Sequence, residues 1–400
     1  MRIVLFTHPA FMASQSMPRF ARMLQQAYQA RGHDVQVWSP PARVHAWVPA
    51  GRLSKWAGYV DQYLLFPLQV RRALARQATD TLFVMADQAL GPWVPLVKHR
   101  PLVVHVHDLL ALRSALGEIP ENPTGFTGRL YQRYIRRGFA QARHFICISQ
   151  RTRNDLERVG GVAPEAAEVV YNGLNQRFAP TPPAEARALL RRAGLPVPEH
   201  GLLLHVSGNQ WYKNVPGVLR LYAHHARTHA NPLPLWLVGV QQTDAVRAAL
   251  ADVPPQGTVH FLHGIDHALL QAAYSLARAL VFPSLAEGFG WPIVEAQACG
   301  CPVVTTDDAP MNEIGGPQSV YLPLLRSGDD LQAWAADGAR ALAALLDEPP
   351  QAARERIAAC LAWSRRFEAD RAITQYLQVY ERVLTSHPVA ASTTLARSAP

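Results

Sequence analysis

The amino-acid sequence predicts two doubly wound α/β domains in tandem, each built on a parallel sheet that helices cover on both faces. The chain has 400 residues, of which 49% are apolar; this exceeds one ordinary core and suits two domains of about 150–200 residues each. Short apolar runs alternate with stretches of helical spacing along most of the chain, a pattern typical of parallel sheets. A polar, proline-containing stretch, residues 175–200, divides this alternation into two series.

The first series begins with a strand, a helix and a second strand. Residues 2–6 form an apolar run, and residues 20–31 carry apolar side chains at helical spacing. Gly32 suits the end of that helix, and residues 34–38 form the next apolar run. Further strands are predicted at 81–85, 101–106, 144–148 and 167–171, with helices at 129–140 and 150–159.

The second series follows the linker, which itself contains one predicted helix, residues 183–193. Six strands are predicted beyond it, at 202–206, 235–238, 259–262, 279–283, 302–305 and 320–322. One long final helix is predicted over residues 351–384 from its apolar spacing. The tail, residues 386–400, is rich in Ala, Ser, Thr and Pro, a composition typical of disorder.

The positive charge of the chain is concentrated in its first half. Residues 1–180 contain 22 Lys and Arg against 11 Asp and Glu, whereas residues 181–400 contain 17 against 19. A basic half of this kind suits an anionic membrane surface, an anionic acceptor or nucleic acid, and it equally suits a solvated basic surface. The sequence has no zinc finger, no RNA-recognition aromatic motif and no basic heptad array, so nucleic acid is not expected as a partner.

The cysteines and the apolar runs predict a cytoplasmic protein. Cys147, Cys299, Cys301 and Cys360 form no CxxC pair, so we expect reduced, buried thiols rather than disulfides or a metal site. Apolar runs such as residues 202–206 are far shorter than the roughly 20 residues that a bilayer span requires. Neither a transmembrane helix nor a signal peptide is expected.

A candidate binding loop follows the fourth strand of the second series. Ligands of open parallel sheets bind outside the carboxyl ends of the strands. Residues 287–291 form a loop there, Pro292 suits the first turn of a helix, and Gly300 suits its end. Amides at such a helix N-terminus can cradle phosphate, and Gly288 and Gly290 would let the backbone approach it closely.

Two glutamates accompany this loop. Glu295, expected near the start of the helix, suits hydrogen bonds from vicinal hydroxyls such as those of ribose, and Glu287 suits the hydroxyls of a sugar. Taken singly, Glu287 is equally typical of an ordinary loop carboxylate, and Glu295 of a residue favoured by the helix dipole. The two together with the strand, the glycines and the helix favour a binding site.

The stretch EGFGWPIVEAQACGCPVV, which begins at Glu287, has seven residues between Glu287 and Glu295. It resembles the signature of the retaining glycosyltransferases of family 4, which include bacterial polysaccharide-type enzymes. This family has the GT-B fold, in which two Rossmann-like doubly wound domains face each other across a cleft. The resemblance covers most of the chain but not residues 40–80 or the tail. Other matching segments are 107–108, 146–149, 171–173, 213–214 and the final helix from residue 363.

The resemblance implies a different task for each part of the chain. Residues 1–190 would form the acceptor-binding domain, and residues 200–362 would bind a nucleotide-diphosphate sugar. The helix at 363–385 would pack back on the first domain, and residues 386–400 would form the disordered tail.

The resemblance also implies a donor site. Glu295 would hold the donor ribose, and Glu287 would hold the donor sugar together with the amides of Phe289 and Gly290. Lys213 would neutralise the diphosphate, because a leaving nucleoside diphosphate accumulates negative charge. The full set of implied donor-binding residues is Asn209, Lys213, His263, Gly264, Ile265, Glu287, Gly288, Phe289, Gly290, Trp291 and Glu295.

The donor site departs from the family pattern in one respect. Many relatives carry an arginine shortly before the lysine, whereas residues 207–212 contain none. Asn209 or an arginine of the first domain would then supply that contact. The nucleobase would lie near His263, against backbone groups, so the sequence does not identify the base.

On the first domain, His105, His107 and Asp108 lie at or just after the end of a predicted strand. His107 resembles the family's active-site histidine, which contacts the transferred sugar, and Asp108 is its neighbour. The implied catalytic residues are thus His107, Asp108 and Glu287. A structural histidine is the alternative, and a metal is not expected because a third ligand at suitable spacing is missing.

The loop after the first strand, residues 7–16, should border the acceptor. Many relatives have paired glycines there, and this chain has none. Ser14, Gln15 and Ser16 are the expected acceptor-side residues.

The activity implied by the resemblance is transfer of a hexose, of mannose or glucose type, from a nucleotide-diphosphate sugar with retention of configuration. The acceptor would be a glycan or lipid-linked molecule of a bacterial surface polysaccharide. No cofactor or metal is expected, since a donor phosphate oxygen would assist deprotonation of the acceptor. The alternatives are a GT-B sugar-nucleotide epimerase or hydrolase and a catalytically silent GT-B binding module.

Residues 44–76 combine aromatic and leucine side chains with several arginines and a lysine. Such a segment suits peripheral contact with an anionic membrane on its inner face, near a lipid-linked acceptor. A core-facing helix with a basic outer face is the alternative.

Overall fold

The computed structural model describes residues 1–12, 16–49, 51–163, 166–197 and 199–387. The chain forms two compact units. Unit 1 contains Met1–Ile148, Arg153–Val170 and the chain from Ile373 onward, and unit 2 contains Ser149–Thr152 and Tyr171–Ala372. No helix of the described residues is long and apolar enough to cross a membrane.

Unit 1 is built on a six-stranded sheet in which every neighbouring pair of strands is parallel. Its strands are short and mostly buried, because helices cover both faces, and this explains their continuous apolar runs. In spatial order they are β2 (Asp34–Trp38), β1 (Arg2–Phe6), β3 (Leu82–Met85), β4 (Leu102–Val106), β5 (Phe145–Cys147) and β6 (Ala167–Val169).

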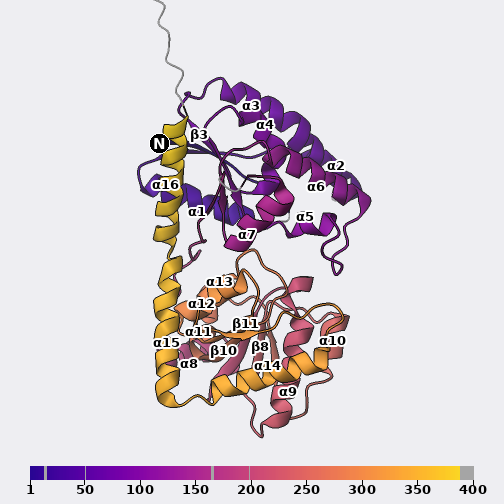
Figure 1. Cartoon of the computed structure of the whole chain (residues 1–400), viewed down its shortest axis with the longest axis vertical. Coiled ribbons are helices and arrows are strands. Elements are labelled where there is room, and N and C mark those ends of the chain that lie inside the picture. The colour runs from indigo at the N-terminus through magenta and orange to yellow at the C-terminus, as the bar shows by residue number, and fades with distance from the viewer. Residues whose placement is uncertain (13–15, 50, 164–165, 198, 388–400) are drawn as a thin grey trace, which may run out of the picture. The chain divides into compact units, whose positions relative to one another are not determined.

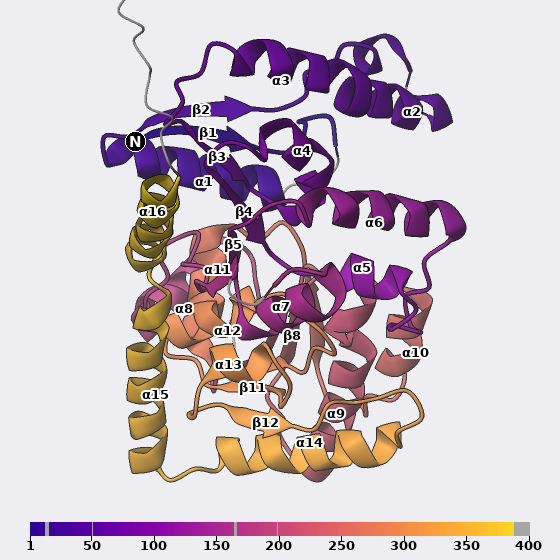
Figure 2. The ribbon, with the colours of Figure 1, turned by 45° about the horizontal axis from the view of Figure 1, so that its top comes forward.

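The helices of unit 1 form two layers, one on each face of this sheet (Figure 2). One layer contains α1 (Ser16–Ala30) and α16 (Ala369–Ser386). They meet β4 at His105, whose Nε2 lies 2.7 Å from the hydroxyl of Tyr380 and whose ring lies edge-on to Phe20.

The opposite layer of unit 1 packs Phe66, Val94 and Phe139 against apolar residues of the strands. It consists of α3 (Phe66–Leu74), α4 (Val94–Val97) and α6 (Phe126–Phe139). A π-helical turn, Asp61–Leu65, joins α3 to α2 (Arg52–Val60) without leaving the right-handed helical region. The remaining described α-helices before unit 2 resumes at Tyr171 are α5 (Leu110–Ala115) and α7 (Gln150–Asp155).

Unit 2 is built on a second six-stranded parallel sheet. Counted from the first strand of the unit, its spatial order is 3-2-1-4-5-6, which is the order of dinucleotide-binding doubly wound folds. In spatial order the strands are β9 (Val259–Leu262), β8 (Leu235–Val238), β7 (Leu202–Val206), β10 (Ala277–Phe282), β11 (Val303–Thr306) and β12 (Val320–Leu322).

Helices also cover both faces of this second sheet (Figure 1). On one face, α9 (Val215–Thr228), α10 (Asp244–Leu250) and α14 (Leu331–Leu346) pack into a buried apolar cluster with the strands. The other face carries α8 (Pro183–Arg192), α11 (His267–Leu276), α12 (Trp291–Ala298), α13 (Met311–Gly315) and α15 (Pro350–Ser364).

The prediction of one continuous final helix over residues 351–384 is wrong. The chain forms α15, a 3₁₀ turn at Arg365–Phe367, and then α16, with Glu368 in an extended conformation. The amide of Leu174 donates to the carbonyl of Phe367, and a Cβ on Gly173 would lie only 2.5 Å from the Cα of Ala369. The loop segment at Gly173 and Leu174 therefore passes tightly against the break between the two helices.

The segment around α8 belongs to unit 2 in the structure. The division between the units lies at Tyr171 rather than at residue 190, because α8 and its flanks pack against α11. The side chain of Gln271 donates to Thr181 Oγ1, and the amide of Thr181 donates to Ser275 Oγ.

Each sheet has one topological switch point, where the strand order reverses. It lies between β1 and β3 in unit 1 and between β7 and β10 in unit 2. Ligands of open α/β sheets bind at the carboxyl ends of the strands that flank such a point. The residues that follow these four strands are therefore the first place to look for a site.

Candidate active site

An ion pair lies at the switch point of unit 2. Lys213 comes from the segment after β7, and Glu287 comes from the loop after β10. The Lys213 Nζ lies 2.6 Å from Glu287 Oε1, and these side chains are only 14% and 8% exposed. The structure thus brings together two residues that the sequence predicts for the donor site, 74 positions apart.

The two loops that carry this ion pair are fastened to each other through the backbone. The amide of Leu285 donates to the carbonyl of Tyr212 at 2.7 Å, and Asn214 Nδ2 donates to the carbonyl of Pro283 at 3.1 Å. Asn214 has a φ of 52°, so it occupies the left-handed region at the start of α9. These contacts hold the ammonium group in place before any ligand arrives.

A buried histidine, His205, connects the two strands that flank the same switch point. His205 on β7 has Nδ1 2.8 Å from the carbonyl of Val281 on β10 and Nε2 2.6 Å from Ser207 Oγ. Burial lowers the pKa of His205 to about 4, despite the hydrogen bond with Val281. The imidazole is therefore neutral near pH 7 and serves as a fixed cross-link between the two strands.

The loop between Glu287 and α12 places backbone groups at the switch point of unit 2. Gly290 has a φ of 102° and directly precedes α12, whose first turn contains Pro292 as predicted. Phe289 is 3% exposed and packs edge-on against Trp291, and the carbonyl of Gly288 accepts a hydrogen bond from Ser149 Oγ. The loop is thus anchored, with a helix N-terminus at its end that favours negative charge.

Glu295 lies in the middle of α12 rather than near its start, where the sequence places it. Its Oε2 accepts a hydrogen bond of 2.9 Å from the hydroxyl of Tyr274 on α11. Burial raises the pKa of Glu295 to about 7, although the Tyr274 hydroxyl and the charge of Lys213 both act to lower it. This carboxyl group therefore titrates near neutral pH when no ligand is bound.

The other predicted donor residues follow neighbouring strands of unit 2. Asn209 pairs with the backbone of Gln241, donating to its carbonyl at 2.8 Å and accepting from its amide at 2.7 Å. Its side chain is thus engaged with the loop after β8, and its predicted contact with the diphosphate remains a prediction. The segment His263–Gly264–Ile265 follows β9, with His263 and Gly264 exposed.

The spacing of these residues along the sheet edge has the scale of a nucleotide. Lys213 follows β7, and His263 follows β9, two strands away. Neighbouring strands lie about 4.8 Å apart, so the two positions are separated by about 10 Å along the edge. A nucleoside diphosphate extends over a comparable length.

In unit 1, His107 is buried at the end of β4. Its Nε2 lies 2.9 Å from the carbonyl of Ala86, and the Phe20 ring lies edge-on to it at 4.6 Å. Burial lowers the pKa of His107, against the raising effect of nearby Asp87. The ring is neutral near pH 7, and its predicted contact with the transferred sugar remains a prediction.

Asp108 serves the local structure. Its Oδ1 accepts a hydrogen bond of 3.0 Å from the amide of Leu110, at the start of α5. Its carbonyl accepts a hydrogen bond from Gln88 Nε2, and Gln88 Oε1 accepts from the amide of His107. Gln88 therefore fixes the turn that carries both predicted residues.

A pair of polar residues that was not predicted from the sequence lies at the switch point of unit 1. His8 follows β1 and Asp87 follows β3, and His8 Nε2 lies 2.8 Å from Asp87 Oδ2, with both side chains nearly buried. The His8 hydrogen bond contributes to lowering the pKa of Asp87, although burial acts in the opposite direction. The rule that selects residues after strands applies equally to Asp87 and would have found it.

Two of the predicted acceptor-side residues, Ser14 and Gln15, lie outside the described residues. Ser16 begins α1. Among the described residues, no group of three or more His, Cys, Asp or Glu side chains could hold a metal ion.

Comparison with known proteins places both units in glycosyltransferase families. The family described as "Glycosyl transferases group 1" matches residues 187–319, and "Glycosyltransferase Family 4" matches residues 17–178. Together these matches cover both units and include Lys213, Glu287 and Glu295.

Two curated relatives illustrate the range of similarity. The O-antigen chain mannosyltransferase B of Escherichia coli is 25% identical over 190 residues, which are 47% of this chain and 49% of the relative. A D-inositol 3-phosphate glycosyltransferase of Xylanimonas cellulosilytica is 30% identical over 304 residues, 72% of this chain and 68% of the relative. The chain thus spans about half the length of the first of these relatives.

A solved structure, Anabaena Alr3699/HepE in complex with UDP and glucose, has the same fold. It superposes with a TM-score of 0.65 over 96% of this chain and 100% of its own, at 18% identity. The two six-stranded parallel sheets and this likeness identify the fold as GT-B. The chain belongs to glycosyltransferase family 4.

Proposed function

We propose that the chain is a retaining, metal-independent glycosyltransferase. It transfers a hexose of mannose or glucose type from a nucleotide-diphosphate sugar to a glycan or lipid-linked acceptor of a bacterial surface polysaccharide. The observation that carries the proposal is the Lys213–Glu287 ion pair at the switch point of unit 2, beside the N-terminus of α12. Relatives named as O-antigen mannosyltransferases and inositol phosphate glycosyltransferases support it.

In the proposed reaction, unit 2 binds the donor and stabilises its leaving group. Lys213 and the amides before α12 face the diphosphate, which gains negative charge as the bond to the sugar breaks. Glu287 exchanges its partner Lys213 for hydroxyls of the donor sugar, and Glu295 accepts hydrogen bonds from the ribose. A donor phosphate oxygen takes the proton of the acceptor, so positioning and charge stabilisation supply most of the rate.

The donor can be identified by thermal shift with UDP, GDP, ADP and dTDP and their hexose conjugates, because a bound ligand raises the apparent melting temperature. We expect one nucleotide series to stabilise the chain. Proton NMR of the product formed from that donor should then give the same anomeric configuration as the donor. Stabilisation by no nucleotide, or a product of inverted configuration, would contradict the proposal.

Activity in excess chelator tests the absence of a metal. We expect the transfer rate to stay unchanged in EDTA, because the ammonium of Lys213 and a helix N-terminus offer positive charge to the diphosphate. The rate would be measured by nucleotide release before and after dialysis against the chelator. A complete loss that a divalent ion restores would overturn this part of the proposal.

The proposal includes the cytoplasm as the site of action and the membrane surface as a contact. All four cysteines are free and buried, which suits a reducing compartment. In the segment predicted to contact the membrane, Leu53, Trp56, Leu64 and Leu68 are each at least half exposed on α2, the π-helical turn and α3.

The apolar surface of α2 and α3 continues onto α6. Tyr63 of the π-helical turn shares a 2.7 Å hydrogen bond with Tyr131 of α6, and α6 exposes Phe126, Leu130 and Tyr134. The outer face of the first segment is thus apolar as well as basic. We define the apolar-basic surface as these residues: Leu53, Trp56, Leu64, Leu68, Phe126, Leu130 and Tyr134, with exposed Lys55, Arg71, Arg72, Arg129 and Arg133 around them.

Acidic residues are nearly absent from this surface, which makes it complementary to anionic lipid. Residues 52–74 contain one acid, Asp61, and residues 126–139 contain none. Asp61 is buried and accepts hydrogen bonds from the amides of Arg43, Val44 and His45. An apolar face with a cationic rim binds anionic interfaces.

Vesicle flotation tests this contact. We expect the chain to bind phosphatidylglycerol vesicles and to bind phosphatidylcholine vesicles much less. The W56S/L64S variant should bind at least about a hundredfold more weakly, because each apolar side chain contributes about 1.5–3 kcal/mol when buried and each 1.4 kcal/mol is a factor of about ten. L116S, which removes an exposed leucine elsewhere in unit 1, should bind as the wild type does. Equal binding by W56S/L64S and wild type would contradict the assignment.

A further inference from the structure

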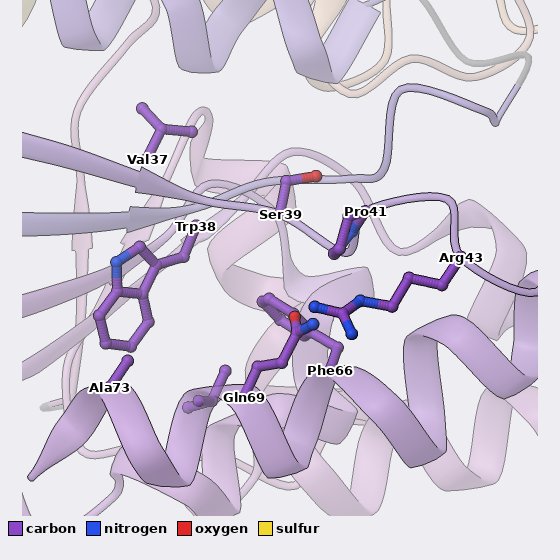
Figure 3. A pocket seen from close by; sticks show the side chains of 9 residues that line it. Val37, Trp38, Ser39, Pro41, Arg43, Phe66, Gln69 and Ala73 are labelled. Atoms are coloured by element: carbon purple, nitrogen blue, oxygen red, sulfur yellow. The ribbon is translucent and has the colours of Figure 1, made fainter.

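A pocket with a volume of about 400 Å³ lies in unit 1 between the end of β2 and α3. Its apolar wall comes from Trp38, Phe66 and Val70, and its polar groups come from Ser39, Arg43 and Gln69. Figure 3 shows the side chains of Arg43 and Gln69 directed toward each other at one end, with Trp38 at the other. The volume is within the range of small-molecule sites, about 300–1,000 Å³.

Arg43 is an uncompensated cation in this pocket. No ion pair joins it to an acid among the described residues, and none of the residues that line the pocket is acidic. With the Gln69 amide oriented so that its oxygen faces the guanidinium, it accepts from Nη2 and Nε at 2.8 and 3.0 Å. A guanidinium has five N–H donors, so this contact orients the group and leaves three donors for a ligand.

The backbone that carries Arg43 is held in place. Its amide donates to Asp61 Oδ2 at 3.0 Å, and the next two amides donate to the same carboxylate. Burial tends to raise the pKa of Asp61, but these three hydrogen bonds leave it lowered. The carboxylate therefore stays charged at neutral pH and keeps its hydrogen bonds with the three amides. The cation is therefore presented from a rigid turn.

The pocket is adjacent to the switch point of unit 1. Ser39, which follows β2, donates its hydroxyl to the carbonyl of His8 at 3.0 Å, and His8 follows β1 and pairs with Asp87. β2 and β1 are neighbours in the sheet. A molecule in the pocket would thus lie one strand from the edge where unit 1 is expected to meet its ligand.

Arg43 also borders a second hollow, which is lined by residues 42–44 and 46–48 and includes Trp47. A ligand whose charged group pairs with the guanidinium can therefore extend to either side of it. Bidentate pairing of this kind is available to a phosphate or a carboxylate and not to a neutral hydroxyl.

We propose that this pocket is a subsite for an anionic group of the acceptor, a sugar phosphate or a sugar carboxylate, held by Arg43. The inference rests on the proposed function, because it deepens the acceptor side of the same reaction. Arg43 binds the anion, Gln69 orients the guanidinium, and Trp38 and Phe66 contact the adjoining apolar face of the ligand.

The test uses the full chain saturated with its cognate nucleotide, so that the diphosphate site near Lys213 is already filled. Calorimetric titrations with glucose 1-phosphate, glucuronate and glucose then compare two anions with a neutral sugar of similar size. The variants are R43Q, R43K and, as a matched control, R22Q, which removes an exposed arginine of α1. R43K keeps the charge but loses the planar fork.

We expect at least one anion to bind the wild type and R22Q roughly tenfold more tightly than glucose does. R43Q should lose this preference, R43K should keep part of it, and all variants should bind nucleotide as the wild type does. Preference for glucose 1-phosphate identifies a phosphate, and preference for glucuronate identifies an acidic sugar. Equal binding of all three sugars to the wild type, or full preference in R43Q, would overturn the inference.

The same titrations separate this inference from the proposed function. Nucleotide that binds normally while the anions show no preference refutes the subsite and leaves the glycosyltransferase proposal standing. Failure to bind any nucleotide refutes the proposed function itself.

Discussion

Replacement of Lys213 by methionine is expected to lower kcat by two to three orders of magnitude. In the proposed reaction the ammonium stabilises negative charge that appears on the leaving diphosphate, and loss of one such group typically costs about 10²–10³ in kcat. The hydrogen bonds of Asn214 and Leu285 fix the segment that carries Lys213 before substrate binds. Initial rates of nucleotide release at saturating donor would measure the effect.

Stability must be separated from catalysis in this variant. Both side chains of the ion pair are largely buried, so K213M leaves the Glu287 carboxylate without its partner. Breaking a buried pair by removing one member costs about 3–5 kcal/mol. The K213M/E287Q double variant removes both charges and should recover most of the melting temperature.

The expected outcome of this comparison is a stable but inactive double variant. K98M is the matched control and should keep wild-type activity. It removes a lysine of unit 1 that donates a hydrogen bond to Gln141. If K213M folds and retains more than about a tenth of the wild-type kcat, Lys213 does not face the leaving group.

Nucleotide affinity is expected to rise with pH through about 7 in the wild type. The pKa of Glu295 is raised to about 7 by burial in the unliganded chain, so the carboxyl group is largely protonated below that pH. Ribose hydroxyls donate best to the charged carboxylate, and binding should therefore release a proton. Calorimetry from pH 6 to pH 8.5, in buffers of different ionisation enthalpy, would measure both quantities.

The E295Q variant should remove this dependence. At pH 8 it should bind nucleotide about ten- to a hundredfold more weakly, because a hydrogen bond to a charged group contributes about 1.5–3 kcal/mol. E381Q, which changes an exposed glutamate on α16, serves as the control. An unchanged pH profile in E295Q would show that another group titrates and that Glu295 does not contact the ribose.

The raised pKa of Glu295 also affects the stability of the fold, which should fall with rising pH whereas nucleotide affinity rises. The pKa of Glu295 is raised in the folded chain above its usual value of 4.5, so folding favours the protonated form. The free energy of unfolding should accordingly fall as pH rises from about 4.5 through 7, and this component should be missing in E295Q.

The sequence predicted the strands of both sheets because buried parallel strands are continuous apolar runs. It did not predict the break between α15 and α16, since residues 364–370 have no proline or glycine. The cause lies elsewhere in the chain, where the backbone of Gly173 and Leu174 approaches Phe367 and Ala369. Tertiary contact of this kind leaves no local signal.

The candidate site could be predicted only in part, because some of its contacts also depend on tertiary structure. Glu287 and Glu295 belong to one short motif and could be recognised together, whereas the Lys213–Glu287 pair depends on the strand order that makes β7 and β10 neighbours. The pairing of His8 with Asp87 has the same origin in unit 1. Arg43 lies outside any motif, and its place in the pocket between β2 and α3 is what indicates a task for it.

The claim that the donor binds unit 2 at this switch point can be tested by hydrogen exchange with the cognate nucleotide. We predict slower exchange in peptides that cover residues 211–214 and 287–298, because the ligand would contact Lys213, the loop before α12 and Glu295. Peptides from the outer strand β12 should exchange at the same rate with and without nucleotide. Nucleotide binding that leaves exchange in residues 211–214 and 287–298 unchanged would contradict the account.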